Sequence, residues 1–175
     1  MTTRHDSTAV LEATGVGAQL AGKYMGFKLG AENFGLQILK VQDIIGLMTI
    51  TAVPRTPAFV RGVINLRGKV IPVVDLRLKF GMEPKEYTDL TCIMVVQVEM
   101  DGSLVTMGFI VDQVSEVMDI KADQVEPTPC FGDGEAARFL LGMGKFQNNV
   151  VMLLDADRIL TAREMTIVDA MSDEA

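Results

Sequence analysis

Short apolar runs separated by turn residues dominate the chain from about residue 23 to residue 160. Apolar runs flank a turn at Gly30 and a second turn at Asp101-Gly102. This arrangement is typical of β-hairpins, because such turns reverse the chain between paired strands. The strands that we expect outside the repeated segment described below cover residues 23–29, 33–39, 41–45, 91–100 and 104–114. The pattern therefore predicts a protein made mainly of short antiparallel strands.

One supersecondary unit occurs twice. Residues 59–80 align without a gap with residues 139–160, which places Gly62 over Gly142 and Asp75 over Asp155. Each copy reads as an apolar strand, a polar turn, a second apolar strand and an Asp placed to cap a short helix. A second echo, 73 residues apart, aligns residues 34–36 with residues 107–109. The chain is therefore predicted to consist of two related halves, residues 22–90 and 91–160.

The ends of the chain read differently from its middle. Residues 1–20 are small, polar and aperiodic, so we expect a mobile tail. Thr161 and Glu164 form a capping-box pattern that opens a final helix, with an apolar face made of Met165, Val168 and Met171. Residues 127–136 read as an irregular loop. Short strands, tight turns and helices confined to brief connectors and the C-terminus favour small β-barrels.

Composition supports a folded protein. The chain has 175 residues, of which 49% are hydrophobic, and its mean hydropathy is +0.28, which makes global disorder a poor interpretation. Its apolar runs are strand-sized and far shorter than the roughly 18 residues of a membrane span. No continuous apolar segment of a signal peptide stands near the N-terminus. We therefore expect a cytoplasmic protein without direct membrane insertion.

Charge is unevenly distributed. The formal net charge is −7, which argues against nucleic acid as the main partner, because affinity for phosphate backbones comes mostly from Lys and Arg. Residues 55–79 nevertheless carry six cations against one acid, so this segment is +5 and the remainder is −12. The segment is either a solvated hairpin whose cations keep strands from aggregating, or a docking face for an acidic protein surface.

Candidate catalytic chemistry is scarce. The single histidine is His5, inside the predicted tail, so a histidine-based nucleophile pair is hard to build. The stretch from Gly62 to Val70 differs from a phosphate-binding loop in spacing, and Val70 stands where a magnesium-binding hydroxyl is needed. Cys92 and Cys130 are isolated and read as reduced thiols. The sequence indicates no enzyme, no cofactor and no metal site.

The string GVINLRGKVIPVVDLR, residues 62–77, is the most distinctive part of the chain. It resembles the signature of the CheW-like family of bacterial chemotaxis coupling proteins. The resemblance extends upstream to residues 34–44 and 56–59 and downstream to residues 108–112, and it covers about residues 23–171. It implies a single domain, residues 21–171, of two intertwined, SH3-like, five-stranded β-barrels with short connecting helices and a C-terminal helix.

The resemblance also implies a function. Members of this family are non-catalytic adaptors that couple the cytoplasmic tips of chemoreceptors to the regulatory domain of the histidine kinase CheA. They are cytoplasmic and are recruited to membrane-associated receptor arrays. The receptor-binding positions implied for this chain are Val41, Asp43, Asn65, Arg67 and Val117. A structural role is implied or expected for four motif residues, Gly62, Gly68, Pro72 and Asp75.

Two other functions stay open. The same fold can couple a kinase to another output, such as twitching motility or development. A protein of a different class would bind a metabolite in a pocket between its barrels. The sequence shows no convergent polar groups for such a pocket, and it does not identify the residues of a kinase interface.

Overall fold

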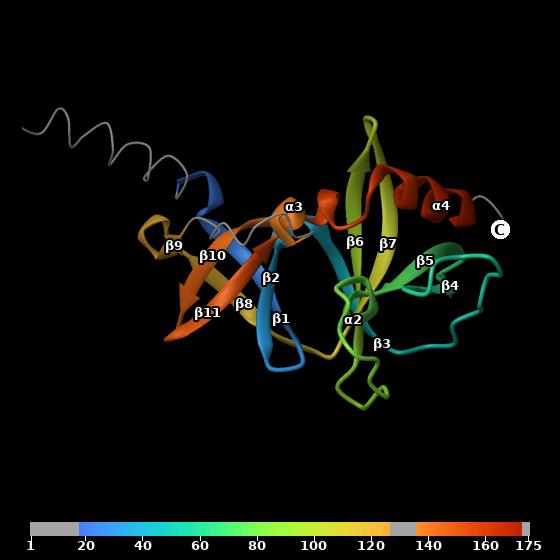
Figure 1. Ribbon diagram of the computed structural model, residues 1–175, viewed down its shortest axis with the longest axis horizontal. Coiled ribbons are helices and arrows are strands. Elements are labelled where there is room, and N and C mark those ends of the chain that lie inside the picture. Colours follow the sequence, from blue (N-terminus) through green and yellow to red (C-terminus); the bar gives the residue numbers. More distant parts are fainter. Residues whose placement is uncertain (1–17, 127–135, 173–175) are drawn as a thin grey trace, which may run out of the picture.

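A computed structural model describes residues 18–126 and 136–172 as two β-sheets that lie side by side (Figure 1). Sheet A has the strand order β8-β1-β2-β11-β10-β9, and sheet B has the order β3-β6-β7-β5-β4. The strands of sheet A are β1 (Gly22–Leu29), β2 (Glu32–Gln37), β8 (Gln113–Ile120), β9 (Val125–Glu126), β10 (Leu140–Phe146) and β11 (Asn149–Leu154). Those of sheet B are β3 (Val41–Gly46), β4 (Val60–Leu66), β5 (Lys69–Asp75), β6 (Cys92–Met100) and β7 (Ser103–Val111).

Each sheet takes strands from both halves of the sequence. The β1–β2 hairpin joins β8 to β11 in sheet A, while the β6–β7 hairpin joins β3 to β5 in sheet B. This exchange of hairpins confirms the predicted mainly-β, intertwined architecture. Two details of the prediction are wrong. Sheet A has six strands, because the two-residue β9 adds to β10, and neither sheet closes into a barrel through a continuous hydrogen-bond ladder.

The sequence repeat is also a repeat in structure. The β4–β5 and β10–β11 hairpins carry a register shift at the same place, next to Gly62 and Gly142. The Asp75 amide donates to the Phe59 carbonyl at 2.7 Å, and the Asp155 amide donates to the Phe139 carbonyl at 2.8 Å. The second echo places β2 beside β11 and β7 beside β5, both in parallel. Residues that the two sequence repeats align therefore occupy equivalent positions in the two sheets.

Two predicted strands end earlier than expected, and both end where the chain crosses between sheets. β2 stops at Gln37, and the 3-10 turn η1 (Ile38–Lys40) leads into β3. The predicted strand 104–114 is divided at Asp112, between β7 and β8. The Asp112 carboxylate accepts from the Gly30 amide at 2.7 Å and binds Arg77 at 2.6 Å. These long-range partners interrupt an otherwise continuous apolar pattern.

Short helices fill the connections. They are α2 (Leu76–Lys79), η2 (Ala122–Gln124), α3 (Ala136–Phe139) and η3 (Ala156–Arg158), and the chain ends in α4 (Ala162–Ser172). Asp75 caps α2 and Asp155 caps η3, as predicted. Thr161 and Glu164 form both hydrogen bonds of the capping box, and Met165, Val168 and Met171 are buried. The final helix is therefore confirmed.

The shared core lies between the sheets. A row of aromatic rings runs through it from Phe27 to Phe34, Phe80 and Phe139, with successive centroids 5.6, 5.8 and 4.8 Å apart. Smaller apolar clusters fill the inside of sheet B and the inside of sheet A. The predicted loop at 127–136 and the predicted tail lie almost wholly outside the described residues. Residues 18–20 are helical, and the Leu20 carbonyl accepts from the Tyr24 hydroxyl at 2.6 Å.

A polar substitution at either of two matched core positions is expected to unfold the protein. Val73 on β5 and Leu153 on β11 are both fully buried, so Val73→Asn or Leu153→Asn leaves an amide without water. An unsatisfied buried polar group costs about 1–3 kcal/mol, and the lost packing adds to it. Urea denaturation should show a much lower midpoint for both variants. An unchanged midpoint would contradict the placement of these residues in the core.

Candidate functional site

The residues expected to bind receptors lie in two places. Asp43 on β3, and Asn65 and Arg67 at the end of β4, come together at one end of sheet B, which we call the mouth of sheet B. Val41 lies on β3 as well and packs against the shared core. Val117 does not join this group, because it lies on β8 in sheet A, where it pairs with Met25. Its side chain is half exposed.

A two-residue turn presents Arg67 to solvent. Arg67 and Gly68 join β4 to β5 with φ values of 53° and 87°, the left-handed conformation of the tight turns that match the twist of a hairpin. The Asn65 side-chain oxygen accepts from the Gly68 amide at 2.9 Å. Arg67 Nη2 lies 3.3 Å from Asp43 Oδ2, and its side chain is 79% exposed. An ion pair this exposed adds little stability.

A cavity of about 360 Å³ lies beside this ion pair. Ile71 on β5 and Val95 on β6 are buried and provide apolar surface, while charged side chains provide polar groups. The lining residues are Gln42, Asp43, Leu66, Arg67, Lys69, Ile71, Val95 and Thr106. Sequence analysis did not single out Val95 or Thr106, because β6 and β7 come from the other half of the chain. The mouth is suited to an apolar side chain with an ionic group next to it.

Gly62 is required by its surroundings. It has a φ of 140°, and a Cβ there would overlap the backbone carbonyl of Thr51, which bridges to β4 through Val63. Gly68 has a positive φ but open space around it. Pro72, which lacks an amide hydrogen, lies just before β5 begins to pair with β7 at Val73. These positions fit the structural roles expected for them.

Asp75 is nearly buried and joins three segments. Its Oδ1 caps α2 by accepting from the Arg77 amide at 2.9 Å, and its Oδ2 accepts from the Tyr87 hydroxyl at 2.9 Å. Arg61 lies over the Tyr87 ring, 5.8 Å from its centroid. Burial raises the pKa of Tyr87 to about 12, and the charge of Asp75 and the hydrogen bond to it add to this effect. Sequence analysis predicted the cap but missed Tyr87.

A buried lysine holds the C-terminal helix. Lys79 Nζ lies 2.8 Å from Glu164 Oε1 and 4.9 Å from the centroid of the Phe59 ring, and its side chain is 4% exposed. Burial alone would raise the pKa of Glu164, but hydrogen bonds from Lys79 and Thr161 outweigh it, so the pKa is lowered. This pair links α4 to α2. Because folding lowers the pKa of Glu164, the pair's contribution to stability is present above the usual pKa of a carboxylate and is lost as pH falls through the lowered pKa.

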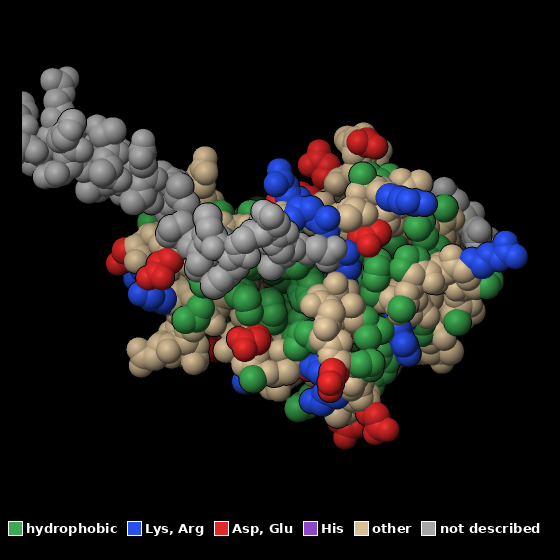
Figure 2. Space-filling view, viewed as in Figure 1, with side chains coloured by type: hydrophobic (Ala, Val, Ile, Leu, Met, Phe, Trp, Pro, Cys, Tyr) green, Lys and Arg blue, Asp and Glu red, His purple; other side chains and the backbone are tan. Residues whose placement is uncertain are grey.

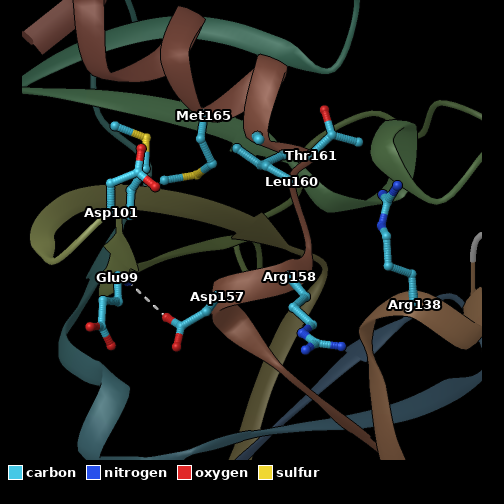
Figure 3. A pocket seen from close by; sticks show the side chains of 10 residues that line it. Glu99, Asp101, Arg138, Asp157, Arg158, Leu160, Thr161 and Met165 are labelled. Carbon is cyan, nitrogen blue, oxygen red and sulfur yellow. Dashed lines mark hydrogen bonds between the residues drawn. The ribbon is translucent and has the colours of Figure 1, made fainter.

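A cavity of about 430 Å³ beside α4 is a candidate small-molecule site (Figure 3). Its Asp157 carboxylate already accepts from the Glu99 amide at 2.9 Å and from Lys40 at 2.9 Å. The Arg138 and Arg158 side chains point in different directions, so they do not converge on one position. The Asp157 carboxylate therefore serves the fold, and the two arginines form no convergent site, which weighs against the metabolite-binding alternative.

On the face shown in Figure 2, Lys and Arg alternate with Asp and Glu and form no broad basic field. Among residues 18–126 and 136–172, no group of three or more His, Cys, Asp or Glu side chains is placed to hold a metal ion. No helix in the same ranges is long and apolar enough to cross a membrane.

Fold and site together define a small double-sheet protein with an exposed ion pair beside a cavity at one end of sheet B. The family model of the CheW-like domain matches residues 23–164, so the chain belongs to the CheW-like family. Chemotaxis protein CheW of Klebsiella aerogenes is 38% identical over 157 residues, which is 87% of this chain and 92% of that protein. Protein FrzA of Myxococcus xanthus is 32% identical, over 81% of this chain and 87% of FrzA.

A solved structure shows the same architecture. The scaffolding protein TtCheW from Thermoanaerobacter tengcongensis matches with a TM-score of 0.73 at 32% sequence identity. The match covers 83% of this chain and 98% of that one. The fold predicted from the resemblance is therefore confirmed by a related protein as well as by the two sheets described above.

Replacing Gly62 should cost far more stability than replacing Gly68. Gly62→Ala places a methyl group against the Thr51 backbone, which cannot move without breaking the bridge to β4, so we expect a loss of about 1–3 kcal/mol or more. Gly68→Ala has the same kind of backbone strain but meets no atom within 4 Å, so its loss should be of order 1 kcal/mol. Equal midpoints in urea would refute this difference.

The two tyrosines should titrate above their usual range. Burial raises the pKa of Tyr24, and that of Tyr87 is raised to about 12, so tyrosinate absorbance should rise at higher pH than for exposed tyrosines, with the Tyr87 part centred near pH 12. The neutral Tyr87 phenol is favoured by folding, so its contribution to stability is complete below pH 10 and is lost as pH rises through 12. Asp75→Asn should lower the Tyr87 pKa, and Tyr87→Phe should remove that transition. A Tyr87 transition centred at 10 in the wild-type protein would contradict the Asp75 contact.

Proposed function

We propose that this protein is a non-catalytic adaptor that couples chemoreceptors to the histidine kinase CheA in bacterial chemotaxis. Membership of the CheW-like family carries the proposal, since the related proteins of known name are chemotaxis and scaffolding proteins. The exposed mouth of sheet B supports it, because a docking surface is what an adaptor needs. The adaptor acts in the cytoplasm and joins receptor arrays at the membrane through its partners.

The mouth of sheet B is the proposed receptor side. Its apolar interior and the Arg67–Asp43 pair offer an anchor for an apolar side chain and a charge to steer an acidic surface. Asn65 and Val41 belong to the same region. Val117 lies on the other sheet, so its contribution requires a receptor that also reaches β8.

The kinase binds elsewhere, because an adaptor that used one surface for both partners could not hold them together. Sheet A offers a separate exposed apolar side chain in Val150, which is 56% exposed at the start of β11. We therefore place the kinase on exposed apolar surface away from Arg67.

A second function within the family differs in pathway. The relation to FrzA of Myxococcus xanthus, at 32% identity, is compatible with coupling a kinase to another output such as twitching motility or development. Affinity purification from the source organism separates the two, since the receptors that copurify identify the pathway. A copurifying small molecule with neither kinase nor receptor would favour the metabolite-binding alternative.

Arg67→Glu should weaken receptor binding while the protein stays folded and still binds the kinase. The side chain is exposed at a turn, where substitutions normally change stability by about 0.5 kcal/mol or less. Reversal of the charge breaks the pair with Asp43 and opposes an acidic partner, and this effect should be greatest at low salt. Two calorimetric titrations measure it, one with receptor cytoplasmic fragments and one with the kinase regulatory domain.

The matched control is Gln147→Glu, which adds an acid at the equivalent turn position of the second copy. It should leave receptor binding unchanged. If Arg67→Glu reduces both titrations equally, or neither of them, Arg67 does not belong to a separate receptor side.

A further inference from the structure

We infer that Asn65 is a positioning residue for Arg67 and not itself a contact for the receptor. The geometry that carries this inference is local. The Asn65 side-chain oxygen accepts from the Gly68 amide at 2.9 Å, across the turn that carries Arg67. That oxygen therefore holds the backbone directly after Arg67. The inference rests on the proposed receptor-side role of Arg67.

Arg67 occupies an unfavourable backbone conformation. Its φ of 53° places it in the left-handed region at the first position of the turn, where Asn, Asp and Gly are the usual residues. For other residues this conformation is disfavoured, because Cβ comes too close to the following carbonyl oxygen. A hydrogen bond that fixes the next amide favours the turn over competing conformations, and it thereby sets the direction in which the Arg67 side chain leaves the backbone.

The second copy of the repeat shows that this bond is not required to reverse the chain. Gln147 and Asn148 form the equivalent turn with φ values of 51° and 64°, and Lys145 stands at the position of Asn65. Lys145 pairs with Glu126 at 2.6 Å and has no oxygen to offer the turn. A tight turn therefore forms in both hairpins, but only the first hairpin fixes it with a side chain.

The difference between the copies matches a difference in what the turn carries. Arg67 Nη2 lies 3.3 Å from Asp43 Oδ2, so the side chain spans from β4 to the opposite edge strand β3. Asn65 fixes the backbone end of Arg67, and Asp43 fixes its guanidinium end. A partner that displaces Asp43 then meets an arginine whose backbone is already held, which lowers the entropy lost on binding.

The test is a double-mutant cycle on the full chain, with receptor cytoplasmic fragments as the probe. Asn65→Ala should weaken binding roughly three- to tenfold, the scale of one hydrogen bond. In an Arg67→Ala background it should cause no further loss, because its effect passes through Arg67. Asn65→Asp keeps an acceptor oxygen and should restore most of the affinity when binding is measured at high salt, where its added charge is screened. Lys145→Ala, the equivalent change in the second copy, should have no effect.

Several outcomes overturn the inference. Additive losses in the cycle, wild-type affinity of Asn65→Ala, or failure of Asn65→Asp to rescue would each assign Asn65 a direct contact or no role. If Arg67→Ala leaves receptor affinity unchanged, the proposed function of Arg67 fails, and hydrogen exchange of the Gly68 amide decides the positioning role. Faster exchange in Asn65→Ala but not in Asn65→Asp supports positioning, whereas unchanged exchange refutes it.

Discussion

The structure depends on the exchange of two hairpins between the halves of the chain. The β1–β2 and β6–β7 hairpins each complete a sheet built mainly from the other half, so the apolar faces of both sheets meet in one shared core. The contact between the Phe34 and Phe80 rings crosses from sheet A to the end of α2 in the first repeat unit. Because each half leaves apolar surface that only the other half covers, the halves gain stability together and not separately.

Each crossing between sheets is fixed by an ion pair of opposite polarity. At the crossing from β7 to β8, Arg77 of the first repeat unit binds Asp112 at 2.6 Å. At the crossing from β2 to β3, Asp157 of the second unit binds Lys40 at 2.9 Å. Arg77 and Asp157 occupy equivalent positions of the repeat, 80 residues apart. The acid lies on the crossing segment in the first pair and on the repeat unit in the second. Exchanging the partners would bring two cations or two acids together, so each pair forms only with its own partner.

The exchange also shapes the mouth of sheet B. β3 and β4 are opposite edges of sheet B, yet the Thr51–Val63 bridge and the Arg67–Asp43 pair draw these edges together. An open sheet edge is prone to pairing with other chains, and the bridge to β4 limits that exposure. Gly62 permits the close approach, since its missing side chain leaves room for the Thr51 carbonyl. Gly62 does not line the mouth of sheet B, yet it is necessary for the shape of the mouth.

Sequence reasoning succeeded where the signal is local or repeated. The strand alternation, the 80-residue repeat and the Thr161 capping box each reflect contacts between neighbours in sequence, and all appear in the structure. It failed where distant segments decide the outcome. Nothing near Asp112 shows that its carboxylate binds Gly30 and Arg77, and nothing near Tyr87 shows that it reaches Asp75. The motif indicated Arg67, but it did not indicate Val95 on the other side of the mouth, because Val95 belongs to the exchanged β6–β7 hairpin.

The two repeat units have kept their backbone and changed their chemistry, and this divergence bears directly on an adaptor's task. The first hairpin ends in Arg67 beside Asp43, whereas the second ends in the uncharged pair Gln147 and Asn148 beside an exposed Val150. Identical surfaces on both units would compete for the same partner. A charged turn on one sheet and an uncharged turn beside an apolar side chain on the other can distinguish two partners, because unpaired charge penalises the wrong one. The fold thus supplies two equivalent positions, and the side chains at the turns make them unequal.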